Sequence, residues 1–269
     1  YQAEIELFGR DREQAPYRVG ANVRFSFTPL QRQAAQMTDA ALRHASRSWV
    51  RYHFDYGSEA MGVTGENIVR AVHRLEVVAE MSRHFSIGVI GQYDSLKYRW
   101  GENLEYANTK MAGILVELRT EKDFRMSAAV GVGRREALST YRYTPNDERD
   151  LVFVRHEMDI LRPQSAFSQV ISVQIAEEGR YHDGWILLDI VNAVEFILLP
   201  ELSLIPRITA RRWFRTYGIT ETEFTCALRC YPVPRFSVEL APMYVMHKQG
   251  WYRDPENTLA IEGRVRVRF

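Results

Sequence analysis

The sequence contains no long uninterrupted apolar run. A membrane-spanning helix needs about 18 or more such residues, and the longest candidate, Trp185 to Pro200, is interrupted by Asp189 and Glu195. A helical membrane protein is therefore excluded. The mean hydropathy of -0.31 does not exclude a transmembrane β-barrel, because barrel strands alternate apolar and polar residues and the two average out.

The chain also lacks an excess of charge and has few cysteines. Its formal net charge is +1, so the basic footprint of a nucleic-acid-binding protein is absent and no nucleic-acid partner is expected. Cys226 and Cys230 lie four residues apart, roughly 13 Å along an extended strand, which is too far for a disulfide. Free thiols on one face are expected. The first residues do not form a charged and apolar leader, so we expect a mature form whose export signal has been removed.

Apolar and polar residues alternate along most of the sequence. From Tyr17 to Thr28 the odd positions are apolar or aromatic and the even positions are mostly polar, a period of two that is typical of strands. Such segments are 1–9, 17–28, 48–57, 67–82, 85–97, 105–119, 123–135, 151–161, 168–177, 184–196, 201–213, 219–230, 235–247 and 257–269. They predict an all-β fold, a transmembrane antiparallel up-and-down β-barrel of about 14 strands, with 12 to 16 possible, forming one domain over residues 1–269.

The predicted connections alternate in length. Tight polar turns are predicted at 83–84, 120–122 and 233–234, and longer connections near 98–104, 139–150 and 248–256. Outer-membrane barrels have short periplasmic turns and longer external loops. This parity places the short turns and the C-terminus on the periplasmic side.

One connection, Pro29 to Ser46, breaks this rule because it is long and Ala-rich. Near 30–46 we expect a short helical insert at the rim or in the lumen, with a mobile loop as the alternative. Small inward residues, among them Ser86, Gly88 and Gly131, suit the approach of a plug or a substrate. They equally suit packing against a neighbouring arginine or tyrosine.

Ionised residues gather on one face of the predicted strands. On the apolar face, His73 and Lys110 are the visible exceptions. A charge on the lipid face at mid-bilayer costs roughly 2 to 4 kcal/mol, which explains this segregation if the apolar face meets lipid. A soluble sandwich or lipid-binding barrel would turn that face inward, but the chain lacks amphipathic helices to cover so large a core. We therefore expect apolar side chains outside and charged ones inside.

The inward face is predicted to carry arginines and carboxylates in similar numbers. The residues expected to line the lumen are Arg24, Arg51, Arg70, Arg74, Glu76, Glu80, Asp94, Arg125, Arg207, Arg211, Glu221, Glu223, Arg229, Glu239, Glu262, Arg264 and Arg266. Such a mixture favours ion pairs within and across the lumen over a selective ring of one sign. Fourteen strands give a diameter between filled small barrels and open porins, so the lumen is either open to a small solute or blocked.

The last predicted strand has the sequence IEGRVRVRF, with Gly263, Val265, Val267 and Phe269 on one face. It resembles the C-terminal signature strand of bacterial outer-membrane β-barrel proteins, in which a terminal aromatic residue follows alternating hydrophobic residues and a glycine. The resemblance implies a Gram-negative outer membrane, with its lipid as surroundings, and insertion by the barrel-assembly machinery through these four residues. Its specific motif covers only the last nine residues and identifies no subfamily.

Candidate catalytic and metal-binding groups are few. His84 and Ser86 form a His-x-Ser pair of the kind that some outer-membrane acyl hydrolases use, but the pair points inward at a predicted periplasmic turn and lacks the surrounding glycine and asparagine. Acid pairs such as Glu157 and Asp159 are expected to partner lumenal arginines. No catalytic residue, metal site or cofactor is predicted, and the chain is not expected to be an enzyme. Aromatic residues near strand ends suggest interfacial girdles: Tyr17, Trp49, Tyr56, Tyr98, Trp100, Tyr141, Trp213 and Trp251.

Three functions remain as interpretations. The leading one is a porin-like channel or translocation pore with a mixed-charge lumen, gated by the helical insert. The second is a structural barrel that anchors partner proteins in a cell-envelope complex. The third is a lipid-modifying outer-membrane enzyme. The sequence identifies neither a solute nor a partner.

Overall fold

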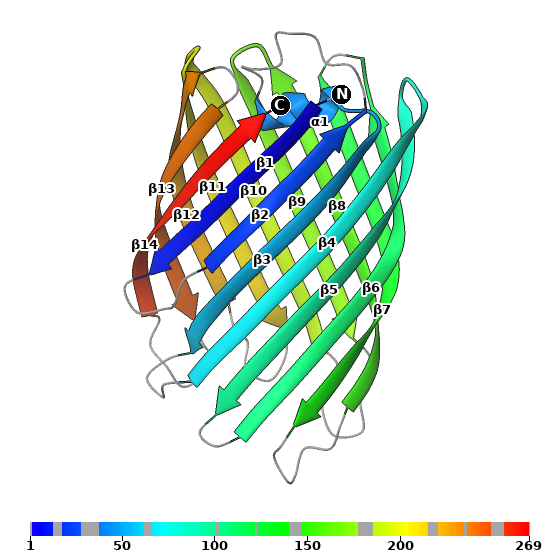
Figure 1. Ribbon diagram of the computed structural model, residues 1–269, viewed down its shortest axis with the longest axis vertical. Coiled ribbons are helices and arrows are strands. Elements are labelled where there is room, and N and C mark those ends of the chain that lie inside the picture. The colour runs from blue at the N-terminus through cyan, green and yellow to red at the C-terminus, as the bar shows by residue number, and fades with distance from the viewer. Residues whose placement is uncertain are drawn as a thin grey trace.

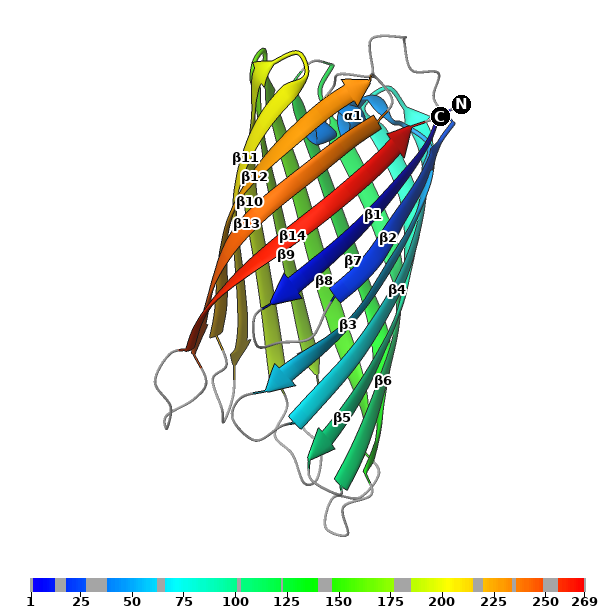
Figure 2. The ribbon, with the colours of Figure 1, turned by 60° about the vertical axis from the view of Figure 1, so that its left-hand side comes forward.

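The protein is described here by a computed structural model, which covers residues 2–12, 18–27, 38–61, 66–100, 103–121, 123–139, 147–176, 185–214, 220–233, 236–248 and 256–268. These ranges form a closed antiparallel barrel of 14 strands with one short helix, α1 (Figures 1 and 2). The elements are β1 (Gln2–Arg12), β2 (Arg18–Ser26), α1 (Asp39–Ala45), β3 (Trp49–Met61), β4 (Glu66–Ser82), β5 (Phe85–Trp100), β6 (Asn103–Arg119), β7 (Phe124–Ser139), β8 (Asp147–Arg162), β9 (Ser165–Ala176), β10 (Trp185–Leu199), β11 (Leu202–Phe214), β12 (Thr220–Val233), β13 (Phe236–Lys248) and β14 (Glu256–Arg268).

Each strand pairs with its neighbours in sequence, and β1 closes the ring against β14. In the closing pair, Glu4 lies opposite Arg268 and Arg12 lies opposite Ala260. The predicted topology and strand count are confirmed. The prediction of a long connection near 98–104 is wrong. Strands β5 and β6 stay paired as far as Trp100, which lies opposite Asn103.

Both chain termini and α1 lie at one end of the barrel (Figure 1). We call this the α1 end, and the opposite end the loop end. At the α1 end, two-residue turns join β4 to β5, β8 to β9 and β10 to β11. The predicted placement of the short turns at the end that holds the C-terminus is therefore confirmed. No helix in the described part of the chain is long and apolar enough to span a bilayer.

Alternate side chains on each strand point outward and inward. The outward Val89, Ile114 and Val130 are 58%, 56% and 57% exposed, whereas the inward Glu76 and Glu117 have no exposed surface. This confirms the predicted orientation. Because every strand is hydrogen-bonded on both sides, the wall needs no water for its backbone, and its exterior can be apolar.

Register joins the outward residues into rows that run around the wall. Val77, Val89, Ile114, Val130 and Val154 are successive opposed partners on β4 to β8. We call the apolar outer surface on both sides of this row the apolar belt.

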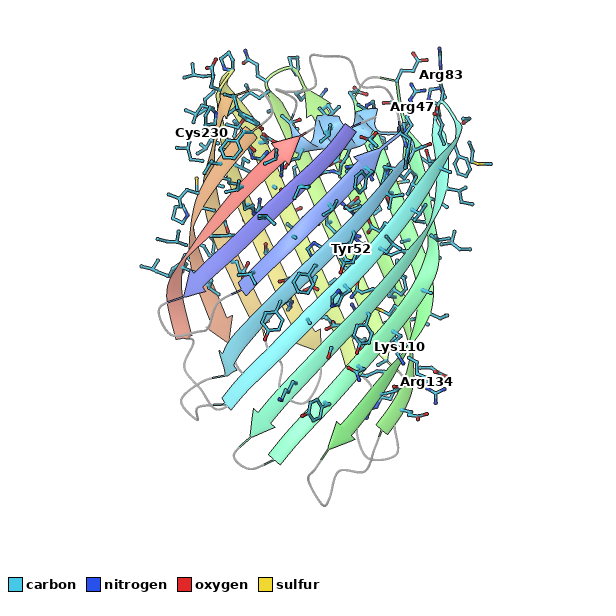
Figure 3. All side chains as sticks on the ribbon, in the orientation of Figure 1. Arg47, Tyr52, Arg83, Lys110, Arg134 and Cys230 are labelled. Carbon is cyan, nitrogen blue, oxygen red and sulfur yellow. The ribbon has the colours of Figure 1, made fainter. Side chains whose placement is uncertain are left out.

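Toward the loop end the outer surface becomes charged (Figure 3). Lys110 lies opposite Arg134, and Arg134 lies opposite Asp150. Lys110 is 3.6 Å from Glu136, and Arg134 pairs with Glu148. The expectation that His73 and Lys110 are the main exceptions on the outer face is therefore wrong. Strands β5 to β8 have 16 or 17 residues, more than the roughly 9 to 11 that cross a bilayer, so their surplus lies beyond the apolar belt.

Candidate lumen site

Most of the predicted lumen residues lie on the inner face of the wall. Those described with their side chains are Arg24, Arg51, Arg74, Glu76, Glu80, Asp94, Arg125, Arg207, Arg211, Glu223, Arg229, Glu239, Glu262, Arg264 and Arg266. The side chains of Arg70 and Glu221 lie outside the described part of the structure, as does Phe269. The other three residues of the predicted insertion signal, Gly263, Val265 and Val267, share the outer face of β14.

Arg125 on β7 is the centre of one buried ion-pair cluster. It is 1% exposed and contacts Glu117, Glu157 at 3.2 Å and Asp159 at 3.1 Å. Arg119 joins the cluster through Glu117 at 2.8 Å. A buried ion without partners costs several kcal/mol, so these groups stabilise one another as a set. The acid pair Glu157 and Asp159 partners lumenal arginines, as the sequence predicts.

Among the described residues, ion pairs join β8 to β3 and β4 across the interior of the barrel. Arg155 on β8 contacts Glu76 on β4, and Glu157 on β8 lies 3.7 Å from Arg51 on β3. Arg51 also donates to Glu76 at 2.6 Å. Three strands separate β4 from β8 along the wall, so these contacts reach across the interior rather than along the wall. They separate a packed part beside β5 to β7 from an open part lined by β1 to β4 and β8 to β14.

The packed part holds a hydrophobic cluster that sequence analysis missed. Its members are Trp49, Val78, Ile90, Met111, Leu115, Ala129, Leu151, Phe153 and Ala176. Phe153 covers two glycines, since a Cβ at Gly113 or Gly131 would lie 2.9 or 2.5 Å from its ring. The inward glycines of this wall, Gly88 and Gly131 among them, therefore face apolar side chains. Ser86 instead receives the guanidinium of Arg119, as the alternative of packing against an arginine expects. The sequence did contain a signal for this cluster, because several inward positions on β5 to β7, such as Ile90 and Leu115, are apolar.

Trp49 also corrects the predicted girdle. It is 2% exposed inside the barrel, with the Arg24 and Arg51 guanidinium carbons 4.8 and 5.3 Å from its ring centroid. A tryptophan face attracts such cations more strongly when the pair is desolvated. Of the other expected girdle residues, Tyr56 is described with its side chain, on the outer face of β3.

A second cluster surrounds Arg229 on β12. Its guanidinium lies 2.6 Å from Glu239, 3.2 Å from Glu195 and 2.9 Å from Asp39. Asp39, the first residue of α1, also pairs with Arg266 on β14. The start of α1 is thus held by arginines from two strands of the wall.

The rest of α1 is anchored inside the lumen in the same way. Thr38 caps the helix by accepting from the Ala41 N–H at 3.2 Å. Arg43 donates to Asp159 at 2.6 Å and to Ser168 at 2.8 Å. Burial opposes the charge of Arg43, but the carboxylates of Asp159 and Glu157 together outweigh burial and raise the pKa of Arg43. The predicted helix is confirmed for 39–45 and lies in the lumen, while residues 30–37 fall outside the described part.

His44 anchors the last turn of α1. Its Nε2 atom lies 2.9 Å from the Thr120 carbonyl oxygen, and Arg119 donates to the Ser46 carbonyl at 3.2 Å. Burial lowers the pKa of His44, and the positive charges of Arg119 and Arg125 lower it further. The neutral ring is therefore the form that fits this position.

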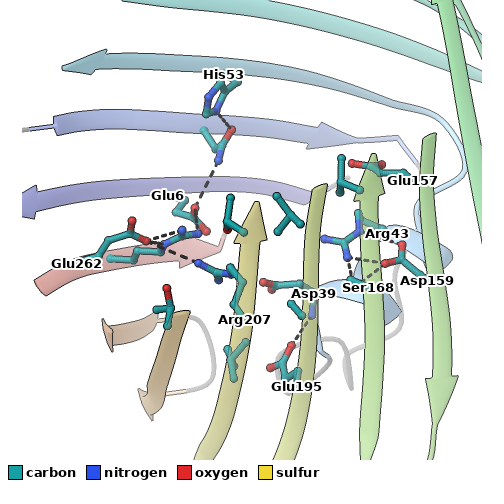
Figure 4. Close-up of a pocket in the computed structure, with 18 of the residues that line it drawn as sticks. Glu6, Asp39, Arg43, His53, Glu157, Asp159, Ser168, Glu195, Arg207 and Glu262 are labelled. Atoms are coloured by element: carbon teal, nitrogen blue, oxygen red, sulfur yellow. Dashed lines mark hydrogen bonds and ion pairs between the residues drawn. The ribbon is translucent and has the colours of Figure 1, made fainter. Parts of the chain in front are cut away.

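The open part of the lumen is a cavity of about 430 Å³ (Figure 4). Its walls differ in chemistry. The charged and polar lining includes Glu6, Asn22, Asp39, Arg43, Arg51, His53, Arg74, Arg155, Glu157, Asp159, Arg207 and Glu262. The aliphatic lining is Ala166, Val170, Val191, Ala193, Ile205 and Met243, from β9, β10, β11 and β13.

The candidate catalytic pair is not assembled in the described part of the chain. His84 Nδ1 lies 3.1 Å from the Arg119 carbonyl oxygen. Ser86 is buried, accepts from Arg119 at 2.9 Å and donates to the Arg47 carbonyl at 3.3 Å. Neither group therefore activates the other. The same described residues contain no group of three or more His, Cys, Asp or Glu that could hold a metal ion, and Cys226 and Cys230 are free thiols as predicted.

Comparison with solved structures places this fold among bacterial outer-membrane barrels. The CymD monoaromatic hydrocarbon channel has a TM-score of 0.54 at 7% identity, over 99% of this chain and 87% of that one. The outer membrane channel DcaP of Acinetobacter baumannii has a TM-score of 0.53 at 7% identity, over 100% and 96%. The Ralstonia pickettii toluene transporter TbuX has 0.50 at 8% identity, over 100% and 89%. No protein-family model matches the sequence, and a search of curated proteins gives no match either. The likeness defines the fold, which is that of a bacterial outer-membrane β-barrel.

Proposed function

We propose that the protein is an outer-membrane channel for a small solute, with α1 as its gate. The observation that carries this proposal is the cavity of about 430 Å³ beneath α1, enclosed by a wall that is apolar outside and charged inside. The similar structures are channels and transporters by name, and this supports the proposal.

The anchorage of α1 suits a gate because it is mainly polar. Asp39, Arg43 and His44 hold the helix to the wall, while its buried apolar residues are Ala40 and Leu42 alone among 39–45. Moving such a helix exposes little apolar surface, and water can replace the partners of its charged groups. A gate of this kind opens without unfolding the barrel.

Conductance in planar bilayers tests the gate. We expect the double variant Asp39→Asn/Arg43→Gln to raise the open fraction of the channel several-fold above wild type, because both ends of α1 lose an ion pair. Arg83→Gln is the matched control, since Arg83 and Glu121 form an exposed pair on the turns of the α1 end. The proposal would be contradicted if the wild type, the double variant and a deletion of residues 30–46 all gave no more current than a bilayer without protein.

We also propose that the α1 end faces the periplasm. The two-residue turns at this end support it, as do the longer connections from β7 to β8 and from β9 to β10 at the other end, since outer-membrane barrels keep their short turns periplasmic. Cysteines introduced at Arg83 and at Arg134, with Cys226 and Cys230 changed to serine, test the orientation. A membrane-impermeant maleimide should label the Arg134 position on intact cells and the Arg83 position only in lysed cells. The reverse labelling pattern would mean that the loop end, not the α1 end, faces the periplasm.

The charged outer surface at the loop end favours a second candidate, a structural barrel that anchors partner proteins. Lys110, Arg134, Glu136 and Glu148 point away from the wall beyond the apolar belt, where a partner could contact them. A scaffold should co-purify with stoichiometric partners in mild detergent and lose them when Arg134 and Glu148 are reversed in charge. A channel needs no such partners.

A further inference from the structure

Arg74 on β4 is a cavity-lining arginine without a paired carboxylate among the described residues. Its Nε donates to Gln92 at 2.8 Å, and this is the one hydrogen bond that the described part of the chain gives it. The neighbouring arginines already have a carboxylate partner, because Arg51 and Arg155 both bind Glu76. The two terminal nitrogens of Arg74 therefore keep their N–H donors for a molecule in the cavity.

Arg207 on β11 lines the same cavity and is loosely engaged. It lies 3.6 Å from Glu239 and 3.9 Å from Glu262, distances too long for hydrogen bonds. Both carboxylates have closer partners, because Arg229 lies 2.6 Å from Glu239 and Arg264 donates to Glu262 at 2.6 Å. Figure 4 shows Arg207 and Glu262 reaching into this space.

The carboxylates of the cavity are largely neutralised by other arginines. Glu157 and Asp159 are bound by Arg125, and Asp39 is bound by Arg229 and Arg266. An anion that enters the cavity thus meets paired carboxylates and two guanidiniums with unused donors. A guanidinium binds two oxygens of one carboxylate through parallel N–H groups.

The aliphatic wall supplies the other half of a binding site. Val170, Val191, Ala193 and Ile205 line the cavity from β9 to β11. A cavity of about 150 Å³ lined by apolar side chains holds a benzene ring, so 430 Å³ leaves room for a ring and its charged substituent. We propose that this cavity binds a small organic anion, with its carboxylate on Arg74 and its apolar body against this wall. The inference rests on the proposed channel and names the class of its solute.

Titration calorimetry of the purified barrel in detergent, with benzoate as the probe, tests the site. We expect saturable binding that Arg74→Gln weakens about tenfold or more, since hydrogen bonds to a charged group are lost. Arg83→Gln should bind benzoate as the wild type does. Formate lacks the apolar body and benzyl alcohol lacks the charge, so each should bind at least tenfold more weakly than benzoate. A difference in gel mobility between unheated and heated samples shows that each variant is folded.

The proposal is overturned if folded wild-type protein does not bind benzoate, if Arg74→Gln binds it equally well, or if benzyl alcohol binds as tightly as benzoate. Calorimetry does not require conduction, so the two proposals fail separately. Binding without conductance would remove the channel and keep the site. Conductance without benzoate binding would keep the channel and remove the anion site.

Discussion

Ionised side chains inside this barrel are arranged in sets, and single substitutions should reveal it. Arg125→Met leaves Glu117, Glu157 and Asp159 without their shared cation in a buried place. We expect a loss of about 3 to 5 kcal/mol in the free energy of unfolding, measured by urea titration in lipid vesicles. Arg83→Met, which breaks an exposed pair, should cost no more than about 1 kcal/mol. Equal effects of the two substitutions would contradict the view that these carboxylates depend on Arg125 as a shared cation.

Glycines on the two faces of the wall offer a second residue-scale comparison. A Cβ at Gly131 would lie 2.5 Å from the Phe153 ring and 2.6 Å from the Gly113 Cα, whereas one at Gly91 would meet nothing within 4 Å. Gly131→Ala should therefore destabilise the barrel by about 1 to 3 kcal/mol through overpacking. Gly91→Ala, on the outer face, should be neutral or stabilising. The temperature at which the folded band disappears on gels checks both.

Strand parity predicts the face of a residue but not its partner. It placed Glu76 inside, yet the contact of Glu76 with Arg155 depends on how near β4 and β8 come across the interior, which no local pattern encodes. Trp49 shows a different error. Alternation with Val50 and Tyr52 already turned it inward, but its place at a strand end suggested a girdle. The guanidinium carbons of Arg24 and Arg51 lie over its ring, and parity alone does not predict that these two residues meet Trp49.

At the scale of the element, α1 carries a pH dependence. Burial and nearby arginines lower the pKa of His44 from its ordinary 6.5. The docked state thus binds a proton less readily than the released state, and docking weakens as pH falls below about 6.5 until the lower pKa of the docked state is passed. A spin label on Ala41→Cys, with Cys226 and Cys230 changed to serine, should become more mobile between pH 7.5 and 5.5.

His44→Gln is the control for this effect. A glutamine side chain can still donate to the Thr120 carbonyl but does not titrate. Its spin-label spectrum should hardly change over the same range. If the variant and the wild type respond alike, another group is responsible.

Strands were easier to predict than the position of α1. A period of two is a local property, so every expected strand from 1–9 to 257–269 has an observed counterpart. The helix was identified from composition, but its seat in the lumen depends on Asp159, Glu195 and Arg229, which are distant in sequence. Only closure of the barrel brings those residues together.

At the scale of the whole molecule, the apolar belt predicts where a charge is tolerated. Ile114 lies within it and is 56% exposed, so Ile114→Arg should lower the free energy of unfolding in bilayers by about 2 to 4 kcal/mol. Ser95 points outward on β5 and lies opposite Asn108. It is nearer the loop end than Tyr93, the residue opposite Lys110. Ser95→Arg should cost no more than about 1 kcal/mol. Equal costs would contradict a bilayer centred on the belt.

The seam between β1 and β14 has a consequence for how long the barrel persists. Glu6 on β1 binds Arg266 and Arg264 on β14, and these contacts exist only once the first and last strands have met. Interactions that are absent from an unclosed intermediate do not speed assembly, but they must be broken before the wall can open. We therefore expect them to act as a kinetic lock, which lengthens the lifetime of the assembled protein far more than it changes the rate of insertion.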